Sequence, residues 1–227
     1  MKCIYGLCAV GLFMMVTSCG IFKHRADDPF YNKRNELRVK SKRGLFPGKH
    51  ITFGGYQTSR KEKGVDSKII SFKRQRSPFH FSLDGPAGNA TSVQATYTDA
   101  GDLGATSLPR MFDSLTHAEL FYAWIRGGTV NALKNWELIL NNPTYQDMID
   151  RREVGVFRSL DESISVHASD RFATGTSSHP LSFEFRLKGV PVAAVRVNGD
   201  EKIWMDRQLN EETRFALAGA MAALLMR

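Results

Sequence analysis

A stretch of twelve residues near the C-terminal end, Phe215–Met226, is apolar apart from Gly219 and limits the folds open to this chain. Asn210 is a good helix N-cap, and Glu211 and Glu212 suit the positive end of a helix, so we expect a helix to begin here. A helix that is apolar on every side must be buried in protein or lie in lipid. Its apolar part would span about 18 Å, well short of the ~30 Å bilayer core. We therefore expect protein to enclose it.

Short runs of apolar or alternating residues recur from residue 50 onward, which is typical of β-strands. In Ser182–Lys188 the alternation is strict, so one face of that strand should be buried and the other exposed. Asn198 and Gly199 indicate a type I′ hairpin, because both central residues of that turn need positive φ. The expected strands, about eleven in number, cover 50–57, 66–73, 78–83, 91–98, 119–126, 135–140, 154–158, 163–168, 181–188, 190–197 and 202–205, with a short helix over 143–150.

These elements predict a mainly β (β-rich α+β) fold in which antiparallel strands surround the apolar helix. The succession Val192–Val197, Lys202–Met205 and then the apolar helix resembles the tubby/phospholipid-scramblase-like barrel. That resemblance implies a closed barrel around the C-terminal helix, over about residues 50–227. The family's phosphoinositide and calcium positions have no counterpart that can be placed on this sequence. Two alternatives stay open: a two-layer α+β domain with the helix across one sheet, and a β-sandwich.

The N-terminus resembles a bacterial lipoprotein leader of the Bacteroidetes type. Lys2 precedes an apolar stretch, Ile4–Val16, which has the length of a signal h-region and is too short for a membrane span. The run Val16-Thr17-Ser18-Cys19-Gly20 matches the lipobox, so the resemblance implies that residues 1–18 are removed and that Cys19 carries diacylglycerol. Gly20, where inner-membrane retention favours Asp, points to the outer membrane. The alternative is an ordinary secretory signal that contains a chance cysteine.

Positive charge is concentrated behind this leader. Residues 20–76 hold 16 basic and 5 acidic residues, a net charge of +11, whereas residues 77–227 hold 14 and 18, a net charge of −4. We interpret residues 19–48 as a lipidated cysteine followed by a basic tether, and residues 49–227 as a single β-rich domain. The tether should contact anionic headgroups, although a merely solvated arm is an alternative. An export signal argues against nucleic acid as the partner. The candidate membrane-contact residues are Lys33, Arg34, Arg38, Lys40, Lys42 and Arg43.

Motifs that carry chemistry are scarce. The chain has no Gly-x-Ser-x-Gly, His-Glu-x-x-His, P-loop or dinucleotide-binding motif. Its cysteines are Cys3, Cys8 and Cys19, so cleavage before Cys19 leaves one and no internal disulfide. Ser165, His167 and Asp170 are the residue types of a hydrolase triad, but a triad is defined by geometry. Trp124, Trp136 and Trp204 are either core residues or the lining of a glycan or lipid site.

The sequence therefore predicts a non-enzymatic, membrane-anchored envelope lipoprotein whose β domain binds or scaffolds a partner. The partners we consider are anionic lipid, another envelope protein and surface glycan. The alternative is an envelope hydrolase that acts on lipid or glycan. We assign no catalytic residue, no metal ligand and no cofactor from the sequence.

Overall fold

The structure, a computed structural model, describes residues 29–43, 49–86, 88–103, 108, 112, 118–127, 134–170 and 181–227. Within them the chain forms 14 strands, two short 3-10 helices and two α-helices. The helices are η1 (Pro29–Tyr31), η2 (Ala100–Asp102), α1 (Tyr145–Asp150) and α2 (Glu211–Met226). The strands are β1 (Glu36–Arg38), β2 (Lys40–Arg43), β3 (Lys49–Phe53), β4 (Tyr56–Thr58), β5 (Glu62–Lys63), β6 (Arg76–Asp84), β7 (Ala90–Asp99), β8 (Glu119–Ile125), β9 (Trp136–Asn141), β10 (Glu153–Arg158), β11 (Ser163–Ser169), β12 (Ser182–Leu187), β13 (Val190–Arg196) and β14 (Lys202–Met205).

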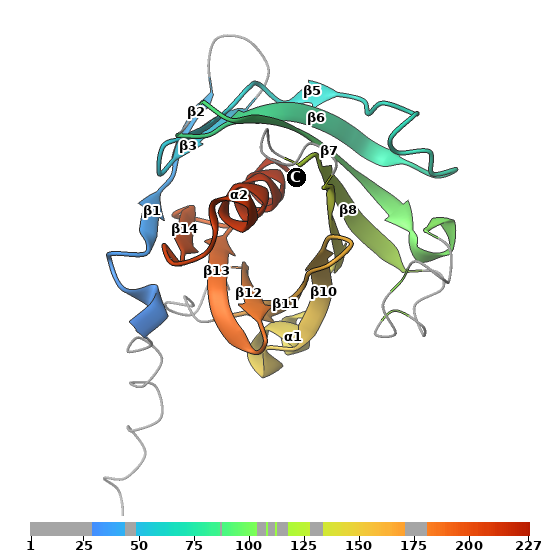
Figure 1. The fold of residues 1–227 in the computed structure, drawn as a ribbon. Helices are drawn as coiled ribbons and strands as arrows, with labels where there is room; N and C mark the ends of the chain where they lie inside the picture. The colour runs from blue at the N-terminus through green and yellow to red at the C-terminus, as the bar shows by residue number, and fades with distance from the viewer. Residues whose placement is uncertain are drawn as a thin grey trace, which may run out of the picture.

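The strands form one antiparallel sheet that curls into a nearly closed barrel around α2 (Figure 1). From β6 to β14 each strand pairs with the next one along the chain. β1 pairs with β14, whereas β2, which follows after Val39 alone, pairs with β3. Residues 36–43 thus connect the two ends of the sheet and leave little unpaired edge. The predicted mainly β fold around the C-terminal helix is confirmed, and the two-layer and sandwich alternatives are wrong.

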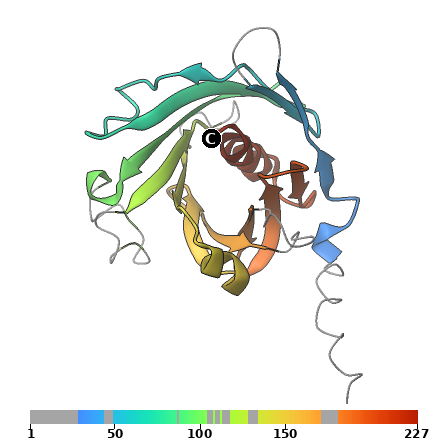
Figure 2. The same ribbon diagram turned by 180° about the vertical axis from the view of Figure 1, so that it is seen from behind.

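Helix α2 lies in the middle of the barrel, as the view from behind also shows (Figure 2). Its N-cap forms as predicted, because the Asn210 side chain accepts a hydrogen bond from the Thr213 N–H at 2.7 Å. Every residue from Phe215 to Met226 is buried. No helix in the described ranges combines the length and the apolar character that crossing a membrane requires.

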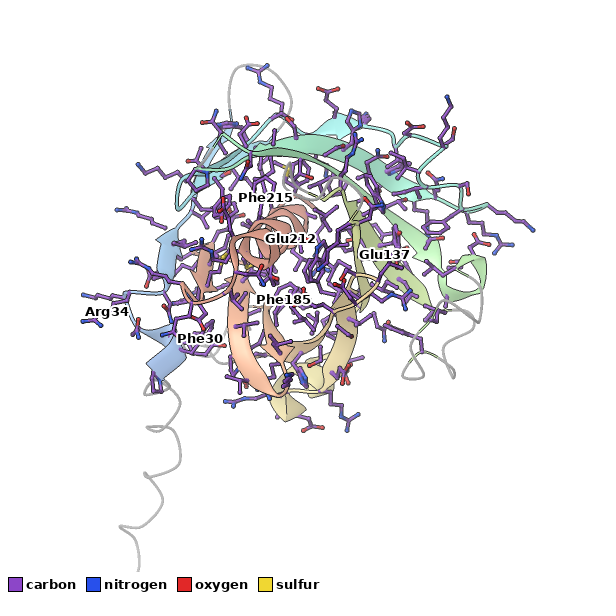
Figure 3. The ribbon with its side chains drawn as sticks, viewed as in Figure 1. Phe30, Arg34, Glu137, Phe185, Glu212 and Phe215 are labelled. Atoms are coloured by element: carbon purple, nitrogen blue, oxygen red, sulfur yellow. The ribbon has the colours of Figure 1, made fainter. Side chains whose placement is uncertain are left out.

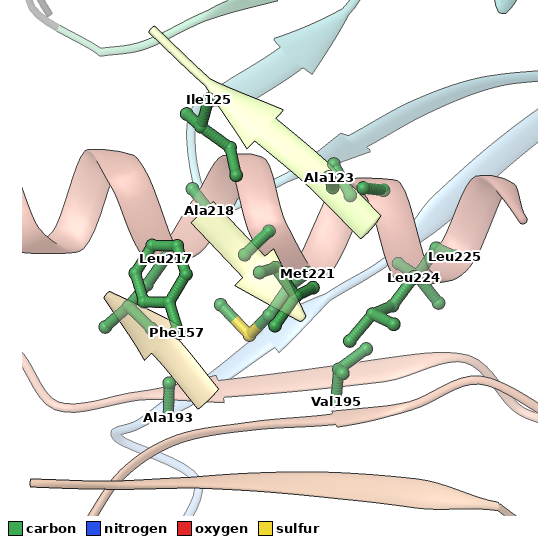
Figure 4. Close-up of a cluster of buried hydrophobic side chains, with 14 of the residues drawn as sticks. Ala123, Ile125, Phe157, Ala193, Val195, Leu217, Ala218, Met221, Leu224 and Leu225 are labelled. Atoms are coloured by element: carbon green, nitrogen blue, oxygen red, sulfur yellow. The ribbon is translucent and has the colours of Figure 1, made fainter. Parts of the chain in front are cut away.

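Small residues allow the strands to approach α2 closely. Ala218 and Ala222 are 0% exposed, and a Cβ added to Gly219 would lie 3.1 Å from Ile125. Larger side chains of the helix, such as Leu217 and Met221, fill the space toward the inward faces of β8, β10 and β13 (Figure 4). The interior is therefore a packed core.

The outer face of β7–β10 carries a second apolar cluster. Along β8 the inward residues Phe121, Ala123 and Ile125 belong to the barrel core, whereas Leu120 and Tyr122 belong to the outer cluster. This division follows from the period of two along a strand. Three buried members of the outer cluster come from outside the sheet: Ile70, Ala100 and Phe112. Partly buried side chains from outside the sheet also pack against it, namely Val65, Phe72, Leu103 and Leu108.

Three cations surround the C-terminal end of α2, where the last carbonyls have no partner within the helix. Lys49 Nζ donates to Leu225 O at 2.8 Å, and Lys61 Nζ donates to Met226 O at 2.6 Å. The Arg227 guanidinium lies 4.9 Å from the centre of the Phe183 ring. Burial lowers the pKa of Lys61, and neighbouring Lys49 lowers it further. Positive charge at this end of the helix is favourable.

Several sequence-based boundaries were wrong, each for a local reason. Residues 50–57 form two strands, because Gly54 and Gly55 adopt φ of +52° and +87° and make a hairpin turn between β3 and β4. Residues 66–73 form no strand; they cover the outer cluster. The hairpin at Asn198-Gly199 exists, but only Gly199 has positive φ, so the turn is longer than type I′.

The tether interpretation of residues 19–48 also needs correction. Residues 36–43 are strands of the barrel wall, so the folded domain begins well before residue 49. Sequence analysis missed β1 and β2 because both are short and rich in charged residues. The predicted signal peptide, residues 1–18, and residues 19–28 lie outside the described residues.

Candidate functional site

The predicted basic residues lie on the segment that closes the barrel. Lys33 and Arg34 occupy the turn before β1, Arg38 ends β1 and Lys40 begins β2; all four are exposed. Figure 3 shows the Arg34 side chain pointing away from the barrel. The backbone of Lys42 and Arg43 continues β2 opposite His50 and Lys49. Cys19 lies outside the described residues.

A pocket of about 300 Å³ opens at the mouth of the barrel, where the first turns of α2 meet the turns that follow β3 and β6. Binding sites are often found at barrel mouths. Apolar residues form much of its wall and charged residues its rim. The lining residues are Leu37, Gly54, Tyr56, Pro86, Asn89, Met205, Asp206, Arg207, Glu211, Arg214 and Phe215.

The charged groups of this mouth pocket differ in whether they already have a hydrogen-bond partner within the protein. Asp206 Oδ1 accepts from the Gln208 N–H at 2.9 Å, and Glu211 Oε1 accepts from Asn89 Nδ2 at 3.1 Å. Arg214 Nε is buried and has no hydrogen-bond partner among the described residues. A buried donor without a partner is costly, so an acceptor bound there would be favoured.

Tyr56 adds a phenol to the same pocket. Burial raises the pKa of its hydroxyl, nearby Arg214 lowers it, and Glu211 raises it. The Tyr56 ring lies 6.1 Å from the Phe215 ring, which fixes its position against the helix. The hydroxyl is therefore protonated at neutral pH and available as a donor.

The mouth pocket lies beside the basic turn. Met205, which lines the pocket, donates its N–H to Asn35 O at 2.9 Å, and Leu37 of β1 lines the pocket as well. Lys33 and Arg34 directly precede this contact. No motif marks the site, because its residues come from β1, two turns, the β14–α2 connection and α2. The one signal in the sequence is Arg214, the last charge before the apolar run.

The comparisons give this chain no relative. No family model, no curated protein and no solved structure matches it.

The triad residue types noted in the sequence come together in part. Ser165 Oγ lies 3.2 Å from His167 Nε2, although consecutive outward residues of a strand need not touch. His167 Nδ1 lies 2.9 Å from Arg151 O, a position that a carboxylate occupies in a triad. Ser165 Oγ also donates to Arg186 O at 3.3 Å. Asp170 is buried directly after the end of β11.

Two carboxylates are register partners of His167, Glu153 on β10 and Glu184 on β12, and the second is already engaged. Glu184 is 2% exposed. It accepts from Arg186 Nε at 2.6 Å and from the Tyr31 hydroxyl. These contacts hold η1 against the barrel wall. Within the described residues, no group of three or more His, Cys, Asp or Glu side chains is arranged to hold a metal ion.

The three tryptophans have different surroundings. Trp136 is fully buried inside the barrel and stacks on Phe157, with 4.7 Å between ring centres. Trp204 is buried beneath Tyr31 on the outer side. Trp124 is only partly buried, on the outer face of β8.

Proposed function

We propose that this protein is a lipid-anchored envelope lipoprotein whose barrel binds anionic membrane lipid and carries out no reaction. The observation that carries the proposal is the proximity of the exposed basic turn, Lys33 and Arg34, to a mouth pocket that contains Arg207 and the buried Nε of Arg214. The two lie on either side of β1, since Leu37 of this strand lines the pocket and the basic turn directly precedes the strand.

The length of chain behind Cys19 fits this placement. Residue 29, the first described residue, follows Cys19 by ten positions, which span at most about 35 Å when extended. A lipid anchor at Cys19 would therefore keep the basic turn close to the headgroups. Each basic residue near an anionic surface contributes about 1 kcal/mol, which supplements the anchor.

The filled barrel directs binding to the outside. Because α2 occupies the interior, a ligand has room at the mouth and on the outer face rather than in a lumen. The architecture agrees at this coarse level with the tubby/phospholipid-scramblase-like resemblance, and we propose membership of that superfamily. The outer membrane is the proposed location.

Vesicle binding tests the proposal. We expect the unlipidated chain from Gly20 onward to sediment with phosphatidylcholine vesicles that contain phosphatidylglycerol and to stay in solution with phosphatidylcholine alone. Reversing four charges, Lys33, Arg34, Arg38 and Lys40 to Glu, should weaken binding by about tenfold or more, since each residue contributes about 1 kcal/mol near the surface.

The matched control reverses four exposed lysines elsewhere: Lys63, Lys68, Lys73 and Lys188. It changes the net charge equally, so a similar loss in both variants would show that overall charge alone drives binding. Mass spectrometry of the native lipoprotein should find acyl chains on Cys19. A mature form without them would contradict the anchor.

One observation favours the hydrolase as a second candidate, namely the contact between Ser165 and His167. We expect Ser165→Ala to leave the hydrolysis of p-nitrophenyl acyl esters unchanged, because His167 Nδ1 lies against the Arg151 carbonyl, where a triad has a carboxylate. The measurement is the initial rate with purified wild-type and variant protein. A Ser165-dependent rate above the buffer background would favour the hydrolase instead.

A further inference from the structure

The outer face of the barrel carries a groove that the proposed membrane contact does not use. Two pockets, of about 460 and 510 Å³, adjoin each other there and share Trp124 and Asn135 as lining residues. One extends toward Arg158 and Leu160, the other toward Asp66. We call this surface the Trp124 groove.

A single cross-strand row forms the floor of the groove. Gln94 of β7 is the register partner of Trp124 on β8, and Trp124 is the partner of Glu137 on β9. Glu137 in turn is opposite Arg158 of β10. With ~4.8 Å between neighbouring strands, the row spans about 14 Å perpendicular to them. Figure 3 marks Glu137 within this part of the barrel wall.

Hydrogen bonds fix the polar members of the row in place. Glu137 accepts from Arg158 Nε and Nη2 at 3.1 and 3.0 Å and from the Tyr122 hydroxyl at 2.8 Å. Gln94 Oε1 accepts from the Asp66 N–H at 2.7 Å. The donors and acceptors beside the indole therefore have set positions before any ligand arrives, which lowers the entropic cost of binding.

The exposure of the row differs from one strand to the next. Gln94 is buried beside the segment 65–72, which lies over the apolar cluster that contains Tyr122 and Ile139, whereas Trp124, Glu137 and Arg158 are partly exposed. Apolar side chains stand at the two ends of the groove, where Leu160 is 98% and Ile69 is 38% exposed. Trp124 lines both pockets between these two ends and is only partly buried, so part of its indole is available for contact with a ligand.

The charges of the groove balance. Asp66 and Glu137 supply two negative charges, and Arg126 and Arg158 supply two positive charges. A charged ligand would therefore gain little net attraction from the groove. The groove offers an aromatic face together with amide, carboxylate and guanidinium groups in fixed positions, which suits a neutral molecule with apolar C–H faces and many hydroxyls.

We propose that the Trp124 groove binds a neutral oligosaccharide, with one sugar ring stacked on the indole and its neighbours hydrogen-bonded to Asn135 and to the Glu137–Arg158 pair. This inference goes beyond the lipid binding proposed above, because it concerns a different surface of the barrel and a different ligand. The groove lies on β7–β10, away from the β1–β2 segment, so a barrel anchored through that segment can hold a glycan at the same time.

The test uses the full chain, purified as the lipoprotein in a detergent without sugar groups. The protein is applied to an array of neutral and acidic oligosaccharides, and the affinity for the best ligand is then measured by calorimetry. We expect saturable binding of a neutral glycan, a loss of tenfold or more in Trp124→Ala, and weaker binding in Asn135→Ala. Asn135 is exposed, so this second variant should fold even if the first does not.

The control is Phe30→Ala, which removes a partly exposed aromatic side chain from η1, outside the groove. It should bind the glycan like the native chain. The inference is overturned if no glycan on the array binds, if Trp124→Ala or Asn135→Ala binds as well as the native chain, or if only acidic glycans or only peptides bind. Vesicle binding by Trp124→Ala should be unchanged, so failure of this inference is distinct from failure of the proposed membrane role.

Discussion

Replacing Ala222 with aspartate is expected to prevent the chain from folding. Ala222 is 0% exposed in the middle of α2, with barrel strands around the helix. An ionised carboxylate there would lose its hydration without gaining a partner, and protonation to avoid that cost is also unfavourable at neutral pH. The penalty of several kcal/mol, with steric strain added, is comparable to the whole stability of a domain, about 5–15 kcal/mol.

The measurement is thermal unfolding followed by near-ultraviolet circular dichroism, in which the variant should show no cooperative transition. Ala90→Asp is the control, because Ala90 is exposed at the start of β7. It lies opposite Asp84, so we expect a cost below about 1 kcal/mol from like charges. A soluble Ala222→Asp variant that unfolds like the control would contradict the buried position of α2.

The elements that could be predicted from the sequence are those with a strong local pattern. The cap at Asn210 and the apolar run after it define α2, and strict alternation defines β12, so both were found close to their observed bounds. The expected exposed face of β12 was wrong at Ser182 and Glu184, which are each 2% exposed. β1 was missed because its assignment depends on long-range pairing, and β2, which pairs with the next strand, was missed because its residues are mostly charged. Residues 36–38 become a strand by pairing with β14, more than 160 positions away.

The sites could be predicted only in part, for the same reason. The exposed basic residues were identified from composition, since charge density is a local property. The mouth pocket and the Trp124 groove depend on register: Gln94, Trp124 and Glu137 share a row only because β7, β8 and β9 pair as they do. The contact between Ser165 and His167 depends on side-chain rotamers, which spacing along a strand does not determine.

Gly155→Ala is expected to be the most destabilising change of a single methyl group in the barrel wall. Gly155 lies in β10 at a register shift and pairs with Leu140 of β9. An added Cβ would lie 2.3 Å from Ile139 O and 2.3 Å from Leu140 Cδ2. The Leu140 side chain can rotate away, but the Ile139 carbonyl oxygen is part of the backbone of the neighbouring strand and cannot move by itself. Relief therefore requires β9 and β10 to separate, which breaks ladder hydrogen bonds on both sides.

The expected cost is about 3 kcal/mol or more, at the upper end for overpacking, or a fall in Tm of roughly 6–12 °C for a chain of this size. Gly219→Ala is the matched control, because Gly219 is also buried and also lacks positive φ. Its added Cβ would meet Ile125 Cγ2 at 3.1 Å, the end of a side chain that can shift. Alanine also favours the helix by about 1 kcal/mol, so this variant should stay within about 1 kcal/mol of the native chain. Equal stability of the two variants would mean that β9 and β10 do not approach each other as closely as the structure has them, and that the glycine is not needed for the barrel to curve at this point.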